Sequence, residues 1–138
     1  GGRHPLCNMC PVIVKKAANN ASANSVFAVG ACGGRKIFPS VFQLISFMVD
    51  NQLDVDDAVH RPRIDNSGSE VIPIMDSMPQ EVVDQLTNRF PQSRLRPNGV
   101  SPNHFALPQL VENVSNSTNT GGCFVPSPHA KVSCADDF

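Results

Sequence analysis

Residues 25–49 constrain the fold most, because a strand pattern there runs through a glycine-rich turn directly into a helix pattern. Residues 25–29 are rich in β-branched and aromatic side chains, which favours a strand. Apolar side chains then recur at positions 41, 44, 45, 48 and 49, which is the period of an α-helix. Pro39 suits the first turn of this helix and Asn51 its C-terminal stop. The segment therefore predicts a strand, a tight turn and a helix in immediate succession.

Shorter elements surround this unit. Residues 9–14 form a β-prone run, and the polar residues 15–25 join it to the next strand, which predicts a hairpin. A short helix starts at Asp54 and must end before Pro62. Short strands are expected at 70–74, 93–96 and 104–111, and an exposed polar loop at 113–122.

A later helix is predicted from a capping pattern. Ser77 precedes Gln80 by three residues, with Pro79 between them, which is typical of a capped helix start. Pro91 ends this helix. Its buried side is expected to consist of the apolar residues Val82, Val83, Leu86 and Phe90. Strands at both ends of the chain with helices between them indicate an α+β layered domain.

Charge and length exclude several classes of protein. The 138 residues include 11 basic and 12 acidic side chains, for a formal net charge of −1. This balance gives no reason to expect a nucleic acid or an acidic membrane surface as partner. The longest apolar stretches fall short of the ~20 residues that span a bilayer. The chain opens like an internal loop, so we expect a processed or truncated piece of a larger protein.

Three Asn-x-Ser/Thr triplets bear on localisation. They begin at Asn20, Asn113 and Asn116 and are candidate N-glycosylation sites. Their number is a mild excess over chance for this composition. We therefore expect an extracellular glycoprotein, either secreted or the ectodomain of a membrane-anchored protein.

The cysteines leave three interpretations open. Cys7 and Cys10 have the C-x2-C spacing of a zinc knuckle or a redox pair. A zinc site would need a second pair at similar spacing, and Cys123 and Cys134 do not supply it. The third interpretation, buried or incidentally bridged thiols, is favoured over both.

The histidines and the other charged side chains indicate no metal site. No two histidines stand four residues apart, and there is no HExxH motif. We expect neither a metal ion nor an organic cofactor. Structural or surface roles are favoured for all four: His4, His60, His104 and His129. Asp56 and Asp57 are interpreted as a favourable negative helix start, and Arg61 and Arg63 as anchors or ion pairs.

The glycines between strand and helix carry the most chemical information. Without Cβ atoms, Gly33 and Gly34 can take positive φ and turn successive N–H groups to the same side. Such an arrangement forms an anion nest, or an oxyanion hole if a nucleophile lies nearby. Taken alone, the glycines are better explained as a tight turn that packs the helix on the sheet.

In order and spacing, these segments resemble the second half of the small subunit of a gamma-glutamyltransferase (gamma-glutamyltranspeptidase, glutathione hydrolase). Residues 2–14 match the family loop P-G-K-R-P-L-S-S-M-[SC]-P-T-I-V in phase. The family pattern G-x-x-G-G-x-x-I and its helix match residues 30–37 and 41–49. The pattern D-x-x-x-A-V-x-x-P-R-[IF] matches residues 54–64, and a later family helix corresponds to 79–90. The Met-Cys-Pro variant of the first loop is more similar to animal members than to bacterial ones.

The resemblance implies a fold and partners. The fold is of the N-terminal-nucleophile hydrolase type, an αββα sandwich to which this chain contributes only part. The two subunits are cut from one precursor, so the expected partners are the large subunit and the N-terminal part of the small subunit. The implied substrate is a small γ-glutamyl compound such as glutathione.

The resemblance also implies site residues. A threonine at the new N-terminus of the small subunit attacks the γ-glutamyl carbonyl, with its free amine as base, and an acyl-enzyme forms. By position, Gly33 and Gly34 form the oxyanion hole, and Cys7 and Asn8 receive the α-carboxylate of the substrate. We expect bulky β-branched residues at either glycine to abolish turnover while leaving the fold largely intact.

Two departures from the family keep a second interpretation open. This chain begins after the family's threonine, so the nucleophile is expected on a preceding segment. Cys7 and Asn8 replace a Ser-Ser pair, and a thiol is a weak donor, which should cost about 1–3 kcal/mol of carboxylate binding. The alternative is a catalytically impaired, secreted paralogue with a binding or structural role. A third interpretation is an unrelated α+β binding module with an anion nest.

Overall fold

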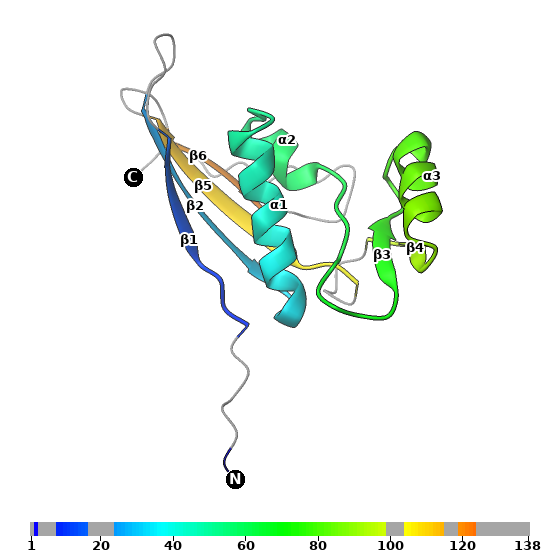
Figure 1. Cartoon of the computed structure of the whole chain (residues 1–138). Coiled ribbons are helices and arrows are strands. Elements are labelled where there is room, and N and C mark those ends of the chain that lie inside the picture. Colours follow the sequence, from blue (N-terminus) through cyan, green and yellow to red (C-terminus); the bar gives the residue numbers. More distant parts are fainter. Residues whose placement is uncertain (1, 3–7, 17–23, 99–103, 115–118, 124–138) are drawn as a thin grey trace.

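The computed structural model describes residues 2, 8–16, 24–98, 104–114 and 119–123. Its main layer is an antiparallel sheet with the strand order β1-β2-β5-β6 (Figure 1). The strands are β1 (Val12–Lys16), β2 (Ser25–Cys32), β5 (Leu107–Val114) and β6 (Asn119–Cys123). Strands β1 and β2 pair antiparallel, so the predicted hairpin is confirmed.

One face of this sheet is covered by two helices, α1 (Ile37–Val49) and α2 (Val55–His60) (Figure 1). Along β2, residues 25, 27 and 29 are buried while 26 and 28 are exposed, which is the alternation of a strand with one covered face. The central positions of the predicted apolar stripe on α1 are buried, namely Val41, Leu44 and Met48. The core combines these side chains with Phe27, Val29, Val55, Ala58, Val59 and Leu110. Burying a large apolar side chain contributes about 1.5–3 kcal/mol, so this layer contact holds the sheet and helices together.

The opposite face of the sheet is uncovered by the described residues and is apolar along its central row, while Lys15, Gln109 and Asn113 also lie on it. We call it the outer face and define it by Ile13, Val26, Ala28 and Val111. Ile13 pairs with Ala28 across one ladder and Ala28 with Val111 across the next, so the three form one row. Ile13 is 77% exposed and Val111 53%.

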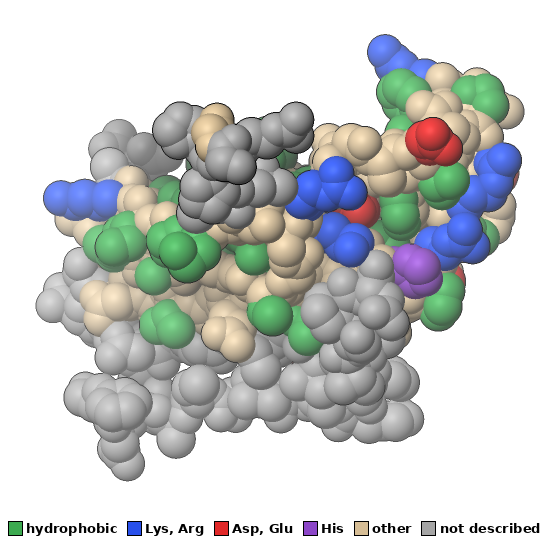
Figure 2. Space-filling view, turned by 90° about the horizontal axis from the view of Figure 1, so that it is seen from below, with side chains coloured by type: hydrophobic (Ala, Val, Ile, Leu, Met, Phe, Trp, Pro, Cys, Tyr) green, Lys and Arg blue, Asp and Glu red, His purple; other side chains and the backbone are tan. Residues whose placement is uncertain are grey.

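A smaller unit lies between α2 and β5 in the sequence. It contains β3 (Ile72–Met75), α3 (Gln80–Arg89) and β4 (Ser93–Arg96), with β3 and β4 parallel. Figure 2 shows Lys and Arg side chains gathered on this side of the molecule, where Arg89, Arg94 and Arg96 lie. None of the helices in the described ranges has the length and apolar character needed to cross a membrane.

Two sequence-based expectations for α3 are wrong. Its N-cap is Pro79, and no side chain caps it, so Ser77 does not form the predicted cap. Only Val83 is buried, while Val82 and Phe90 are 39% and 38% exposed. Among the described residues, α3 packs mainly against β4 of the two-stranded sheet, and this narrow contact buries fewer apolar side chains than the sequence pattern predicts.

The chain near residues 113–122 also differs from expectation. Strand β5 continues to Val114 and β6 begins at Asn119, so most of the predicted polar loop belongs to paired strands, and residues 115–118 lie outside the described part. The polar, turn-forming residues of this segment predict a loop. In the structure, they instead form strands through backbone pairing, such as that of Glu112 with Thr120.

The short helix α2 forms as predicted. The Oδ1 atom of Asp54 accepts a hydrogen bond from the Asp57 backbone N–H at 2.8 Å, which is an N-cap. After the helix, Ile64 pairs with Ile74 of β3 in an isolated antiparallel bridge.

The Gln43 side chain ties α1 to this extended segment. Its Nε2 atom donates to the Ile64 carbonyl at 2.9 Å, and its Oε1 atom accepts from the Ile64 N–H at 3.0 Å. The amide thus pairs with both backbone polar groups of one residue, as a neighbouring strand would. Nε2 also donates to the Pro39 carbonyl at 2.9 Å.

Replacing Gln43 should therefore destabilise the protein. Gln43→Leu leaves the part-buried N–H and C=O of Ile64 without a partner, and each such group costs about 1–3 kcal/mol. We expect the free energy of unfolding in urea to fall by at least about 2 kcal/mol. Gln85→Leu, at an exposed position on α3, is the matched control and should change it by less than about 0.5 kcal/mol. Equal effects of the two substitutions would contradict the bridging role.

Candidate functional site

The turn between β2 and α1 requires glycine at two successive positions. Gly33 has φ +151° and Gly34 has φ +60°, both in the range that side chains disfavour. A single turn of 3-10 helix, η1 (Gly34–Lys36), follows at once and leads into α1. Within the described part of the chain, the N–H groups of Gly33 and Gly34 donate no hydrogen bond. Both groups are therefore available to a bound oxygen.

Gly33 is also fixed by close packing. A Cβ atom at this position would lie 2.7 Å from the Cα atom of Ala106 and 2.8 Å from its Cβ atom. The sheet register explains this approach, since Cys32 pairs with Leu107 and the next residues on each side face each other. A Cβ atom at Gly34 would have no other atom within 4 Å.

This contact corrects one expectation. A β-branched residue at Gly33 would collide with the Ala106 backbone, so it would not leave the fold largely intact. The sequence hides the collision, because Ala106 is more than 70 residues away along the chain. At Gly34 the space is open, and only the backbone conformation opposes a side chain.

A polar hollow of about 290 Å³ lies beside the turn. It brings together residues before β1 and the start of the helix: Asn8, Met9, Cys10, Gly34, Arg35 and Phe38. Two predicted site residues, Asn8 and Gly34, thus line one hollow, although 25 positions separate them. Gly33 lies next to it in the turn, and Cys7 lies outside the described residues.

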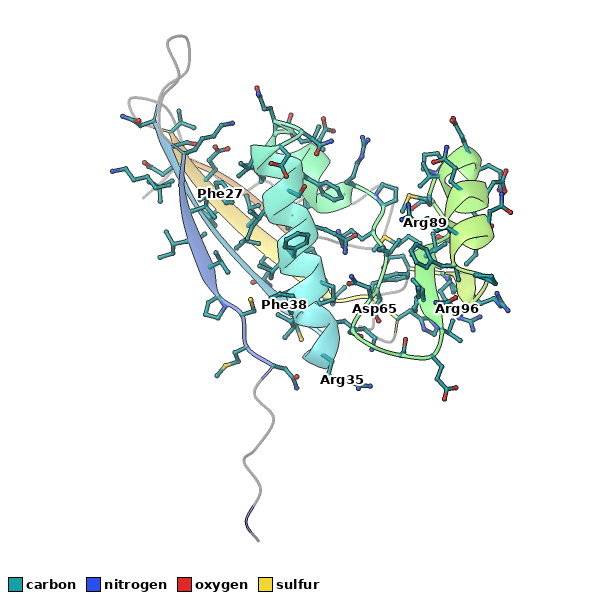
Figure 3. All side chains as sticks on the ribbon, viewed as in Figure 1. Phe27, Arg35, Phe38, Asp65, Arg89 and Arg96 are labelled. Carbon is teal, nitrogen blue, oxygen red and sulfur yellow. The ribbon has the colours of Figure 1, made fainter. Side chains whose placement is uncertain are left out.

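The hollow has the chemistry of an anion site. The side-chain amide of Asn8 is a donor, and the backbone N–H of Gly34 stands at the start of a helix, where partial positive charge favours anions. Arg35 also lines the hollow, at the same end of α1 as Phe38 (Figure 3). Sequence reasoning did not select Arg35, although a cation directly after two glycines was a usable signal.

Among the residues that the structure describes, the histidines and cysteines form no second site. The Nδ1 atom of His60 lies 2.9 Å from the Asp56 carbonyl and 3.2 Å from its carboxylate, which is a local pair on α2. His4 and His129 lie outside the described residues. Cys10 and Cys32 are free thiols. In the ranges that the structure describes, no three His, Cys, Asp or Glu side chains gather to hold a metal ion.

The remaining candidates fall in different settings. Asn113 is exposed near the end of β5, while Asn20 and Asn116 lie outside the described residues. Asp56 and Asp57 stand in the first turn of α2, as interpreted from the sequence. Arg63 is an anchor, since it is 1% exposed and donates to two backbone carbonyls. Burial lowers the pKa of Arg63 to about 10, which leaves its guanidinium charged at neutral pH.

Comparisons with known proteins identify a family for this chain. The sequence model of Gamma-glutamyltranspeptidase matches residues 1–116. The Acylase ACY 1 proenzyme of Pseudomonas sp. (strain V22) is 30% identical over 88 residues, which cover 64% of this chain and 15% of that protein. This chain therefore spans a small part of the length of the curated relatives it matches.

Solved structures give the same result. A mutant of the gamma-glutamyltranspeptidase of Helicobacter pylori matches with a TM-score of 0.69 and 25% identity, covering 91% of this chain and 64% of that one. The transpeptidase CapD of Bacillus anthracis matches with a TM-score of 0.67 and 17% identity, covering 91% and 70%. The predicted fold class, α+β of the N-terminal-nucleophile hydrolase type with this chain as one part, is confirmed.

The two glycines should respond differently to the same substitution. Gly33→Ala forces a Cβ atom against the Ala106 backbone, and overpacking of this kind typically costs about 1–3 kcal/mol beyond the backbone strain. Gly34→Ala meets only the strain of positive φ, about 1–2 kcal/mol. We expect Gly33→Ala to lower the thermal midpoint of the full-length protein more than Gly34→Ala. The reverse order would contradict the packing of Gly33 on Ala106.

Proposed function

Because the chain belongs to the gamma-glutamyltranspeptidase family, we propose that it forms part of an enzyme that transfers or hydrolyses γ-glutamyl groups of glutathione-like compounds. The observation that carries this proposal is the hollow shared by Asn8 and Gly34 beside the glycine turn. Family membership excludes the interpretation as an unrelated α+β binding module.

In the proposed mechanism, a preceding segment supplies the nucleophile and base, and this chain supplies hydrogen-bond donors. The hydroxyl oxygen of an N-terminal threonine outside this chain attacks the γ-carbonyl carbon, and its proton passes to the threonine's free amine. The leaving amine takes that proton as the carbon–nitrogen bond breaks, which leaves an ester. Water or an acceptor amine then attacks the ester and restores the threonine.

Gly33 and Gly34 are assigned to the charge that develops on the carbonyl oxygen. Each tetrahedral intermediate carries a negative oxygen, which the N–H groups of the turn can stabilise. Their lack of acceptors within the described residues supports this role. Losing one such donor typically costs about 100- to 1000-fold in turnover.

Asn8 and Cys7 are assigned to the α-carboxylate of the donor. The Asn8 amide lines the hollow and offers N–H groups to an oxygen. Cys7 precedes it directly and contributes a weaker S–H donor. Arg35 lines the same hollow, so its positive charge can offset part of the loss of the family's hydroxyl.

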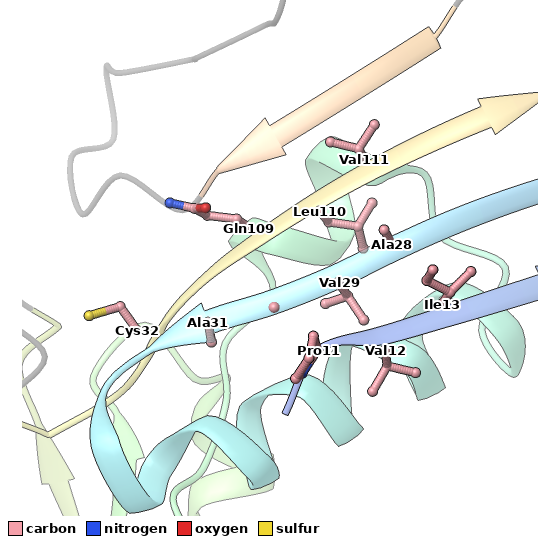
Figure 4. A pocket seen from close by; sticks show the side chains of 11 residues that line it. Pro11, Val12, Ile13, Ala28, Val29, Ala31, Cys32, Gln109, Leu110 and Val111 are labelled. Atoms are coloured by element: carbon pink, nitrogen blue, oxygen red, sulfur yellow. The ribbon is translucent and has the colours of Figure 1, made fainter. Parts of the chain in front are cut away.

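The outer face of the sheet is assigned to the missing parts of the protein. An open apolar hollow of about 870 Å³ follows this sheet, with Ile13, Ala28 and Val111 among its lining residues (Figure 4). An αββα sandwich needs a second sheet on this face. The proposed occupants are the large subunit and the N-terminal part of the small subunit from the same precursor.

We also propose an extracellular location, secreted or membrane-anchored, for the whole protein. The Asn-x-Ser/Thr triplets that begin at Asn20, Asn113 and Asn116 support this proposal. The intact mass before and after enzymatic removal of N-glycans tests this. An unchanged mass of protein isolated from its natural source would contradict it.

A catalytically impaired paralogue is the alternative, and one observation favours it. Cys7 replaces a hydroxyl residue of the family loop. Release of the anilide from a γ-glutamyl anilide by the processed full-length protein decides between the two. We expect release together with a threonine at the small-subunit N-terminus. No release despite correct assembly would favour the paralogue.

The Asn8 assignment predicts a specific kinetic change. Asn8→Ala removes a hydrogen bond to a charged group, which is worth about 1.5–3 kcal/mol, so KM for the γ-glutamyl donor should rise about 10- to 100-fold. Asn51→Ala, exposed beyond the far end of α1, is the control and should leave KM unchanged. An unchanged KM for Asn8→Ala would remove this residue from the site.

The outer-face assignment predicts an assembly defect. Ala28→Asp places a charge in the centre of the apolar row between Ile13 and Val111, where burial of an unpaired carboxylate is costly. We expect co-purification with the rest of the protein to fall at least tenfold. Gln85→Asp on exposed α3 adds the same charge and should leave assembly intact. Normal assembly of Ala28→Asp would place the second sheet elsewhere.

A further inference from the structure

We propose that Arg63 is a positioning residue for the Gly33–Gly34 turn and that it acts through the backbone of Ala106. The catalytic part of this inference rests on the proposed function, in which the turn holds the oxyanion. Arg63 itself lines neither described hollow.

Arg63 is held in place from several directions. Its backbone carbonyl accepts from the Met75 N–H at 3.1 Å, and the Asp65 N–H donates to the Pro73 carbonyl at 2.9 Å. Between these bonds, the Gln43 amide fixes both polar groups of Ile64. The guanidinium therefore projects from a main-chain segment that cannot easily shift.

The guanidinium joins two separate parts of the chain. Nη1 donates to the Val59 carbonyl at 2.9 Å, in the last turn of α2, where carbonyls lack helical partners. Nη2 lies 3.4 Å from the Ala106 carbonyl. The side chain is 1% exposed, so water cannot replace these contacts readily.

Ala106 connects this cation to the turn. Its carbonyl faces Arg63, and its Cα atom occupies the space that a side chain at Gly33 would need. Ala106 is 1% exposed and directly precedes β5. A shift of the Ala106 backbone therefore changes the surface against which Gly33 packs and, with it, the direction of the Gly33 and Gly34 N–H groups.

The expected change in kcat follows because the oxyanion forms only during the reaction and is absent from the bound substrate. Donors aimed at this oxygen act in the transition state far more than in the bound substrate. A loosened turn should therefore lower kcat and leave KM for the donor almost unchanged. A side chain with a purely structural role would instead lower the amount of folded enzyme without changing the kcat of the folded fraction.

The test uses the processed full-length protein with Arg63→Lys and Arg63→Met. Lysine keeps the charge but lacks the fork that reaches two carbonyls, and methionine removes the charge at similar length. Arg61→Met, an exposed arginine two residues away, is the control. The readouts are kcat and KM per folded enzyme with a γ-glutamyl anilide, and amide hydrogen exchange of residues 33–36.

We expect Arg63→Lys to lower kcat at least tenfold with KM within twofold, and exchange at 33–36 to quicken at least tenfold. If Arg63→Met folds, it should lower kcat and quicken this exchange further. If it does not fold, the result for Arg63→Lys tests the inference. A kcat within twofold of wild type for Arg63→Lys, or exchange at 33–36 equal to that of Arg61→Met, would overturn the inference. A wild-type protein without anilide release would overturn the proposed function instead, and hydrogen exchange would still decide whether Arg63 holds the turn.

Discussion

The contact between Gly33 and Ala106 is the constraint on which the rest of the structure depends. Strand β2 ends there, beside the start of β5, and the missing side chain lets the two backbones meet. Because the chain must turn at that point, α1 begins at a fixed place and lies across the sheet that it covers. The same turn leaves two N–H groups without acceptors among the described residues, so the geometry that fixes the packing is also the one on which the proposed oxyanion role rests.

The two faces of the sheet have different roles. The inner face is complete, since α1 and α2 bury Phe27, Val29 and Leu110. The outer face keeps Ile13 and Val111 more than half exposed, which is costly in water unless another layer covers them. This asymmetry agrees with a chain that supplies one part of a larger sandwich.

Local patterns predicted the elements whose causes are local. The β1–β2 hairpin, the centre of the α1 stripe and the Asp54 cap each depend on residues within a few positions of one another, and these are confirmed, although Val49 at the end of the stripe is exposed. Non-local contacts were not predictable in this way. The pairing of Gln43 with Ile64, the approach of Ala106 to Gly33 and the burial of Arg63 depend on how distant segments meet. The wrong prediction at Ser77 arose from a local pattern, since the sequence fits a side-chain cap there but the helix begins after Pro79 without one. For the site, the family resemblance selected Asn8 and Gly34, while Arg35 was missed.

The most direct test is a crystal structure of the processed full-length protein with a γ-glutamyl boronate or phosphonate bonded to its nucleophile. Such a compound places a tetrahedral oxygen where the oxyanion would form. We predict that this oxygen lies about 2.7–3.1 Å from the backbone nitrogens of both Gly33 and Gly34. An oxygen directed away from the turn, with other donors around it, would contradict the assignment of these glycines to the oxyanion.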